Sequence, residues 1–141
     1  MIKWPITYTD YNGETRTEDF YFNLSKPEIM ELQLNANGAY GAYLKRIIQE
    51  RDGKEMAKAY RELITKAYGE KTDDGRRFVK SKELTDAFMQ TEAYSELYME
   101  LFTDMKACEK FFNGVFPKDW EKYASKMSAE NVPQEVLSLA N

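Results

Sequence analysis

The chain has 141 residues, of which 43% are hydrophobic and 31% are charged, and its formal net charge at pH 7 is −4. This length suits one domain. The acidic balance argues against nucleic-acid binding, which normally uses a basic surface, and no apolar run reaches the roughly 20 residues that span a bilayer.

Residues 2–24 are predicted to form a β-hairpin, because apolar and polar residues alternate along the first strand and Asn12-Gly13 is a strong turn signal. A two-residue turn would pair Trp4 with Tyr21. A three-residue loop that ends at a left-handed Gly13 would shift this register by one residue. We expect the three-residue loop because it collects four large apolar side chains on one face: Ile2, Trp4, Phe20 and Phe22.

Pro5 indicates the position of the first strand in any larger sheet. Proline has no amide hydrogen to donate to a ladder, so we expect this strand to be an edge. Because a two-stranded ribbon is marginal alone, the apolar face must lie on the helices or the ribbon must add to a partner's sheet.

The next segments are predicted to be helical. Ser25 and Glu28 have the spacing of a capping box, which starts a short helix that ends near Asn35. Apolar residues at helical spacing continue over 40–51 and again over 56–68. The turn signal Asp52-Gly53 favours two antiparallel helices, and one long bent helix is the alternative.

Residues 70–80 are the most polar stretch and are predicted to form a solvated turn, after which Phe78 or Val79 packs on the core. Neither Asp73-Asp74 nor the basic run that follows has the ligand spacing of a known metal or anion site. Ser81 is predicted to cap a short helix before the next element.

The segment 91–114 is predicted to be one long helix at the centre of the core. Thr91 can cap its start, Gly114 can end it in a left-handed conformation, and Pro117 blocks continuation. Its apolar residues recur at steps of three and four, as a packed face requires: Tyr94, Leu97, Tyr98, Leu101, Phe102, Met105, Cys108 and Phe112. We interpret this stripe as core rather than as a partner groove.

The expected fold class is therefore α+β, mainly α, with an N-terminal β-hairpin packed on a bundle of about four to five helices. Residues 1–117 would form this single domain, and 118–141 would be a C-terminal tail, partly helical or mobile. Tail residues with large apolar side chains are candidates for partner binding: Trp120, Tyr123, Met127, Val136, Leu137 and Leu139. Packing of Trp120 and Tyr123 back onto the core is the alternative for that pair.

Nothing in the sequence indicates catalysis. There is no histidine and only one cysteine, which excludes Ser-His and Cys-His pairs and an intramolecular disulfide. No P-loop, paired CxxC or dinucleotide fingerprint occurs. The acidic residues are spread as on solvated helix surfaces, which disfavours a two-carboxylate hydrolase. We expect a protein that is not an enzyme and that has no cofactor, metal, nucleic-acid or membrane partner.

Several phrases resemble one known family. They are ITYTDYNGETRTEDFYFNLSKPEIMEL near the start, then AYGEKTDDGRRFVKSKEL, FMQTEAYSELYMELFTD and KFFNGVFP. These phrases are similar to tail assembly chaperones of long-tailed, siphovirus-type phages of Gram-positive hosts. The likeness covers roughly residues 5–117, and no motif matches beyond Pro117.

The resemblance implies a non-enzymatic, mainly helical protein of virion assembly. Members of such families bind and solubilise the tape-measure protein and recruit tail-tube subunits in the host cell cytoplasm, and they are absent from the mature virion. Coating a long client would require self-association, for which an open spiral is one arrangement. The alternative hypothesis is a small phage-encoded inhibitor of a host defence or regulatory protein.

Overall fold

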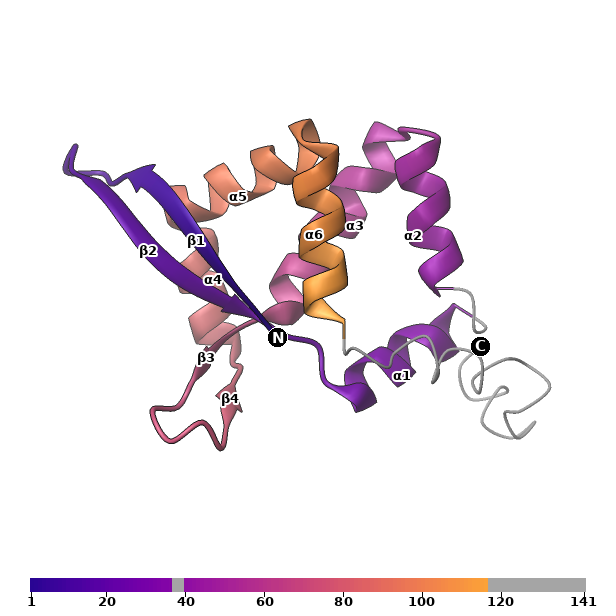
Figure 1. Cartoon of the computed structure of the whole chain (residues 1–141), viewed down its shortest axis with the longest axis horizontal. Helices are drawn as coiled ribbons and strands as arrows, with labels where there is room; N and C mark the ends of the chain where they lie inside the picture. Colours follow the sequence, from indigo (N-terminus) through magenta and orange to yellow (C-terminus); the bar gives the residue numbers. More distant parts are fainter. Residues whose placement is uncertain (37–39, 117–141) are drawn as a thin grey trace.

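The computed structural model describes residues 1–36 and 40–116. An N-terminal pair of strands is followed by helices and a second, smaller pair of strands, so the α+β, mainly α class is confirmed (Figure 1). The strands are β1 (Ile2–Thr9), β2 (Thr15–Phe22), β3 (Tyr68–Lys71) and β4 (Phe78–Val79). The helices are α1 (Lys26–Asn35), α2 (Tyr40–Gln49), α3 (Gly53–Ala67), α4 (Lys82–Met89), α5 (Glu92–Thr103) and α6 (Met105–Val115).

The β1–β2 hairpin has the predicted register. Trp4 lies opposite Phe20 and Ile2 lies opposite Phe22. The amide of Asp10 donates to the carbonyl of Glu14 at 2.8 Å, which closes a three-residue loop. Gly13 has φ +83°, as a left-handed loop position requires. In the described residues the strand order is β1-β2-β3-β4, so the prediction from Pro5 that β1 is an edge is confirmed.

The apolar face of the hairpin packs against α5 and α6. Trp4 is 7% exposed, and its ring meets that of Phe111 edge-on with the centroids 5.4 Å apart. Phe22 is fully buried and contacts Phe111 in the same manner at 5.1 Å. These aromatic contacts join the beginning of the chain to its last described helix, and they hold the sheet on the helical layer.

Two helices start at the caps that the sequence indicates, Ser25 and Ser81, and α3 starts at the predicted turn Asp52-Gly53. Ser25 and Glu28 form the complete capping box of α1. The side chain of Asp52 accepts from the amide of Glu55 and begins α3, so α2 and α3 are two helices rather than one bent helix. Ser81 caps α4 in the same way.

The polar stretch after α3 is different from the prediction. Helix α3 ends at Ala67, and Tyr68 and Gly69 continue as β3 by pairing with Phe22 and Tyr21 of β2. β3 then turns back to pair with β4. The close approach of Phe78 to Gly69, where a Cβ would lie 2.6 Å from its Cε2, leaves room only for glycine. The strand exists because its backbone pairs with the end of β2 at Tyr21 and Phe22, which no side-chain alternation reveals.

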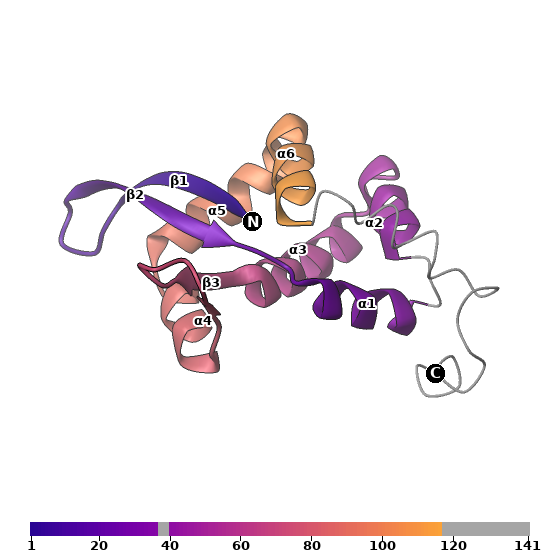
Figure 2. The same cartoon turned by 60° about the horizontal axis from the view of Figure 1, so that its bottom comes forward.

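The prediction of one long central helix over 91–114 is wrong, because the structure has two helices there. Asp104 interrupts it, because its carboxylate accepts from the amides of Lys106 and Ala107, both at 3.1 Å, and so begins a new helix. α5 and α6 change direction at this point (Figure 2). Gly114 does not end α6 in a left-handed conformation. It lies inside that helix, which continues to Val115.

Candidate partner-binding surface

The tail residues proposed to bind partners lie outside the described residues. They are Trp120, Tyr123, Met127, Val136, Leu137 and Leu139. The described residues offer other surfaces, among them a groove between α3 and α5 and a hollow along α4.

A groove of about 330 Å³ lies between α3 and α5. α5 supplies four of its lining residues, which lie on two successive turns of that helix, and α3 supplies one basic residue. The lining residues are Arg61, Tyr94, Ser95, Tyr98 and Met99. The cap at Thr91, whose hydroxyl accepts from the amide of Tyr94 at 3.3 Å, fixes where α5 begins and hence which residues face α3.

The rings of Tyr94 and Tyr98 line this groove, and Phe102 continues the aromatic row beyond it. Tyr94 and Tyr98 have centroids 6.0 Å apart, and Tyr98 and Phe102 are 5.4 Å apart. All three are half-buried, so each ring is held by the core and still presents part of its surface. The hydroxyl of Tyr98 lies 3.5 Å from the carbonyl of Ala57 on α3, to which it donates a long hydrogen bond.

Met99 forms the most exposed apolar part of the groove. Its exposed fraction is 56%. Methionine is flexible and polarisable, and it adapts to the irregular surface of a partner. The aromatic row and Met99 together make a surface that suits apolar side chains.

Arg61 gives the groove one positive charge. In the part of the chain that the structure describes, its guanidinium makes no ion pair. Burial raises the pKa of the Tyr94 phenol, and the nearby Arg61 cation opposes that shift. Tyr94 therefore stays neutral at physiological pH. Because Arg61 has no ion pair among the described residues, it can pair with a carboxylate of a bound partner.

A second hollow, of about 470 Å³, lies along α4 and is lined mainly by charged and amide side chains. It is lined by Lys82, Glu83, Asp86, Ala87 and Gln90. The Lys82 amine and the Asp86 carboxylate are 2.6 Å apart and satisfy each other at the surface. An exposed pair of this kind is typical of a solvated helix face, so the α3–α5 groove is the better candidate despite its smaller volume.

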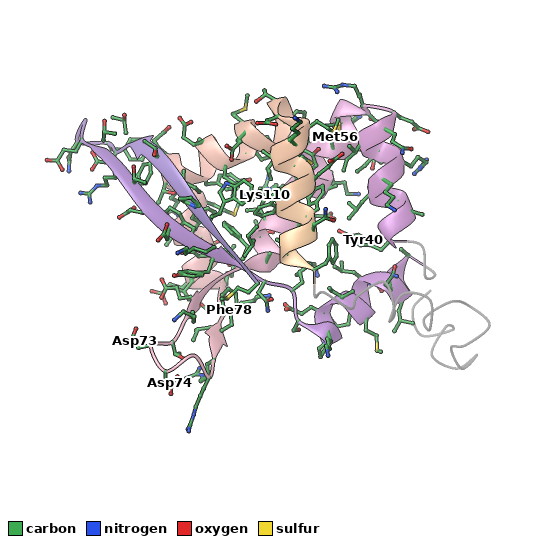
Figure 3. The ribbon with its side chains drawn as sticks, viewed as in Figure 1. Tyr40, Met56, Asp73, Asp74, Phe78 and Lys110 are labelled. Carbon is green, nitrogen blue, oxygen red and sulfur yellow. The ribbon has the colours of Figure 1, made fainter. Side chains whose placement is uncertain are left out.

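The acidic and thiol side chains of the described residues do not cluster as metal ligands. No group of three or more Asp, Glu, His or Cys side chains there could hold a metal ion. Asp73 and Asp74 lie at the tip of the β3–β4 turn, away from the helices (Figure 3). Cys108 is 1% exposed, and its sulfur lies 3.2 Å from the hydroxyl of Tyr60. None of the described helices is long and apolar enough to cross a membrane.

The sequence pattern assigned two of the four groove residues on α5 to the core. Tyr94 and Tyr98 belong to the apolar stripe that we interpreted as packing, and the structure leaves both half-buried. The signal that could have separated them is Met99, which stands outside the helical spacing of the core positions. Arg61 gave no signal, because only the crossing of α3 over α5 brings it to the groove.

Comparison with known proteins gives one match. A family model described as phage tail assembly chaperone matches residues 1–138. No curated protein and no solved structure match the chain.

Proposed function

Because this chain belongs to the phage tail assembly chaperone family, we propose that it binds the tape-measure protein, keeps it soluble and helps to recruit tail-tube subunits during virion assembly. The observation that carries this proposal is the apolar α3–α5 groove with its exposed Met99. The protein would act without catalysis in the host cell cytoplasm and would be absent from the mature virion.

An amphipathic helix of the client fits the chemistry of the groove. Apolar side chains at steps of three and four would lie along Tyr94, Tyr98 and Met99, as in other helix-in-groove complexes. An acidic residue on the flank of that helix would pair with Arg61. Binding of this kind would cover the client's apolar stripe, which is what would otherwise cause it to aggregate.

The tail supplies a second set of proposed contacts. Within the division into a 1–117 domain and a 118–141 tail, its apolar residues would bind the client or other copies of the chain. Coating a long client with many copies requires contacts between copies, and an open spiral is one arrangement that continues without closing.

Co-expression with the tape-measure protein of the same phage tests the main proposal. The wild-type chain should move that protein into the soluble fraction. Met99→Glu should reduce the soluble amount, since a charge would be placed in the apolar groove. Met30→Glu is the matched control, because Met30 is 46% exposed but lies on α1, away from the groove. Equal effects of the two variants, or no effect of the wild-type chain, would contradict the proposal.

A truncation tests the tail. A chain of residues 1–117 should remain folded with little loss of stability, while self-association or client solubilisation falls. Replacing Trp120 and Tyr123 together by Ala should reproduce part of that loss. An unfolded or aggregated 1–117 chain would show instead that the tail belongs to the core.

A further inference from the structure

The outer edge of β2 is open along most of its length. β3 pairs with β2 only at Tyr21 and Phe22, so in the described residues the segment 15–19 has β1 as its one strand neighbour. All five residues of this segment are exposed. The outer part of the hairpin projects beyond the helices in both views (Figures 1 and 2), and in its loop the hydroxyl of Tyr11 bonds to Glu92 of α5.

The direction of the backbone groups along this edge follows from the ladder. Asp10 and Glu14 are a hydrogen-bonded pair, so the even-numbered residues of the hairpin bond across it and the odd-numbered residues turn their N–H and C=O groups outward. The amide of Asn23, which donates to Ala67 on the β3 side, agrees with this alternation. Thr15, Thr17 and Asp19 therefore present unused donors and acceptors at the open edge.

The two edges of the hairpin are not equivalent. On β1 the outward positions include Lys3 and Pro5, which are the residue types that natural proteins place on edges to prevent strand addition. Pro5 removes the one donor in the middle of that edge. β2 has neither a lysine nor a proline along 15–19. Its edge is therefore the one that can accept another strand.

We propose that a second copy of this chain pairs with that edge, β2 against β2, antiparallel about a two-fold axis at Thr17. Charge selects this register. With the axis at Thr17, Arg16 of each copy lies opposite Glu18 of the other, a contact made in addition to the pair of its guanidinium with Asp10 of its own chain at 2.6 Å. An axis at Arg16 would place the two copies of Arg16 opposite each other, and an axis at Glu18 would do the same with the two copies of Glu18. Like charges directly opposite each other destabilise a strand pair.

The same register satisfies the backbone. Thr17 would bond with Thr17 of the second copy, and Thr15 with Asp19 of the second copy, which gives about six hydrogen bonds across the axis. The residues that make these bonds are the outward-facing ones, so no bond of the β1–β2 ladder is lost. The contact is isologous, as in most two-fold dimers.

This inference rests on the proposed function only for the expectation that copies of the chain contact one another. The edge lies on β2, whereas the client groove lies between α3 and α5. Pairing and client binding therefore use different surfaces and can be tested separately.

Charge exchange tests the register. The full-length wild-type chain should sediment as a concentration-dependent dimer. Arg16→Glu and Glu18→Arg should each weaken the dimer roughly tenfold or more, because like charges would then oppose each other twice. An equimolar mixture of the two variants should dimerise again. In the mixed pair the introduced carboxylate faces the introduced guanidinium, and the unchanged Glu18 of one variant faces the unchanged Arg16 of the other. A monomeric wild type, or a mixture that stays monomeric, would overturn the proposal.

Proline substitution tests the edge itself. Thr17→Pro removes the central outward donor of β2, and Thr7→Pro removes the donor of its cross-strand partner on β1. Both variants lose the hydrogen bond between the two threonine hydroxyls, which are 2.9 Å apart, so their effects on the hairpin are matched. Only Thr17→Pro should abolish the dimer, with circular dichroism confirming that both variants fold. Equal sedimentation of the two variants would mean that the copies contact each other elsewhere, and it would overturn the proposed pairing at the β2 edge.

A failure of this inference differs from a failure of the proposed function. If Thr17→Pro stays dimeric but the wild-type chain still solubilises the tape-measure protein, only the β2 edge is wrong. If Thr17→Pro becomes monomeric but the wild-type chain does not change the solubility of that protein, the edge stands and the client proposal falls.

Discussion

Trp4 donates its indole N–H to the carboxylate of Glu100 at 2.9 Å, across 96 residues of sequence. The same ring has the amine of Lys110 5.6 Å from its centroid (Figure 3) and meets Phe111 edge-on. One side chain of the hairpin thus contacts both α5 and α6. The hydrogen bond satisfies the polar group of a buried indole, as burial of Trp requires.

Trp4→Ala should destabilise the protein by roughly 3 kcal/mol, because it empties a buried aromatic site. Chemical denaturation followed by circular dichroism measures the loss. Lys3→Ala on the opposite face is the control and should change the free energy of unfolding by less than about half a kcal/mol. A Trp4→Ala loss as small as that of the control would mean that the hairpin face is not held on the helices.

Asp104→Ala should cost about 1 kcal/mol, the usual loss of an N-cap side chain. The carboxylate accepts from the amides of Lys106 and Ala107 at the start of α6. Asp104→Asn keeps an acceptor and should lose clearly less. Thermal unfolding of the two variants provides the comparison, and similar losses for both would show that the cap does not anchor the helix break.

Gly114→Ala and Gly53→Ala should change stability in opposite directions. A Cβ at Gly114 would lie 2.3 Å from Cδ1 and 2.8 Å from Cβ of Ile2, so this variant should lose about 1–3 kcal/mol through overpacking. Gly53 has nothing within 4 Å and lies at the first position of α3. Alanine there should add about 0.5 kcal/mol by restricting the unfolded chain. Two losses of similar size in urea denaturation would rule out the close contact as the cause.

Stability should fall at alkaline pH partly through Tyr40. Burial, with a contribution from Glu62, raises the pKa of its phenol from 10.0 to about 12. The unfolded chain releases this proton above pH 10 while the folded chain retains it, so rising pH between 10 and 12 favours unfolding. Tyr40→Phe has no such proton and should lose roughly 1–3 kcal/mol less across that window. Denaturation curves at pH 9 to 12 measure this difference, and parallel curves for the two proteins would contradict it.

Cys108 should react slowly with thiol reagents in the native state. Burial raises the pKa of its thiol, and the sulfur lies against the Tyr60 hydroxyl inside the core. Ser95→Cys in the groove is the positive control and should react quickly, since Ser95 is exposed. Modification of Cys108 should accelerate only when denaturant unfolds the chain. Rapid native modification would put this face of α6 in solvent.

The hairpin register could be predicted because the alternatives differ in their side chains. Only one loop length places Trp4 and Phe20 on the same face, and burial rewards that choice. The capping residues Ser25 and Ser81 could be predicted for a similar reason, since each acts on amides within a few residues.

β3 could not be predicted in this way. Its pairing with β2 is a backbone interaction between Tyr68-Gly69 and segments almost fifty residues earlier, and Gly69 has no side chain to indicate a face. The break at Asp104 was hidden for another reason. The apolar residues of α6 continue the spacing of α5, so the stripe remains in phase although the helix direction changes.

The groove depends on tertiary geometry still more strongly. Tyr94 and Tyr98 have the spacing of core residues, and their partial exposure results from where α3 crosses α5. Exposure of Met99 is the one part that a helical projection would have shown. The tail residues that the sequence singled out, Trp120 and Tyr123 among them, stay predictions.

The contact of Ile2 with Gly114 has a consequence for the order of events during translation. The hairpin is among the first parts of the chain to be made, but the surface that Ile2 and Trp4 pack on, around Phe111 and Gly114, is made roughly a hundred residues later. At about 5–20 residues per second this interval is on the order of 5–20 s. Since a two-stranded hairpin is marginal alone, the part of its face around Ile2 and Trp4 is not fully covered on the nascent chain until α6 has emerged.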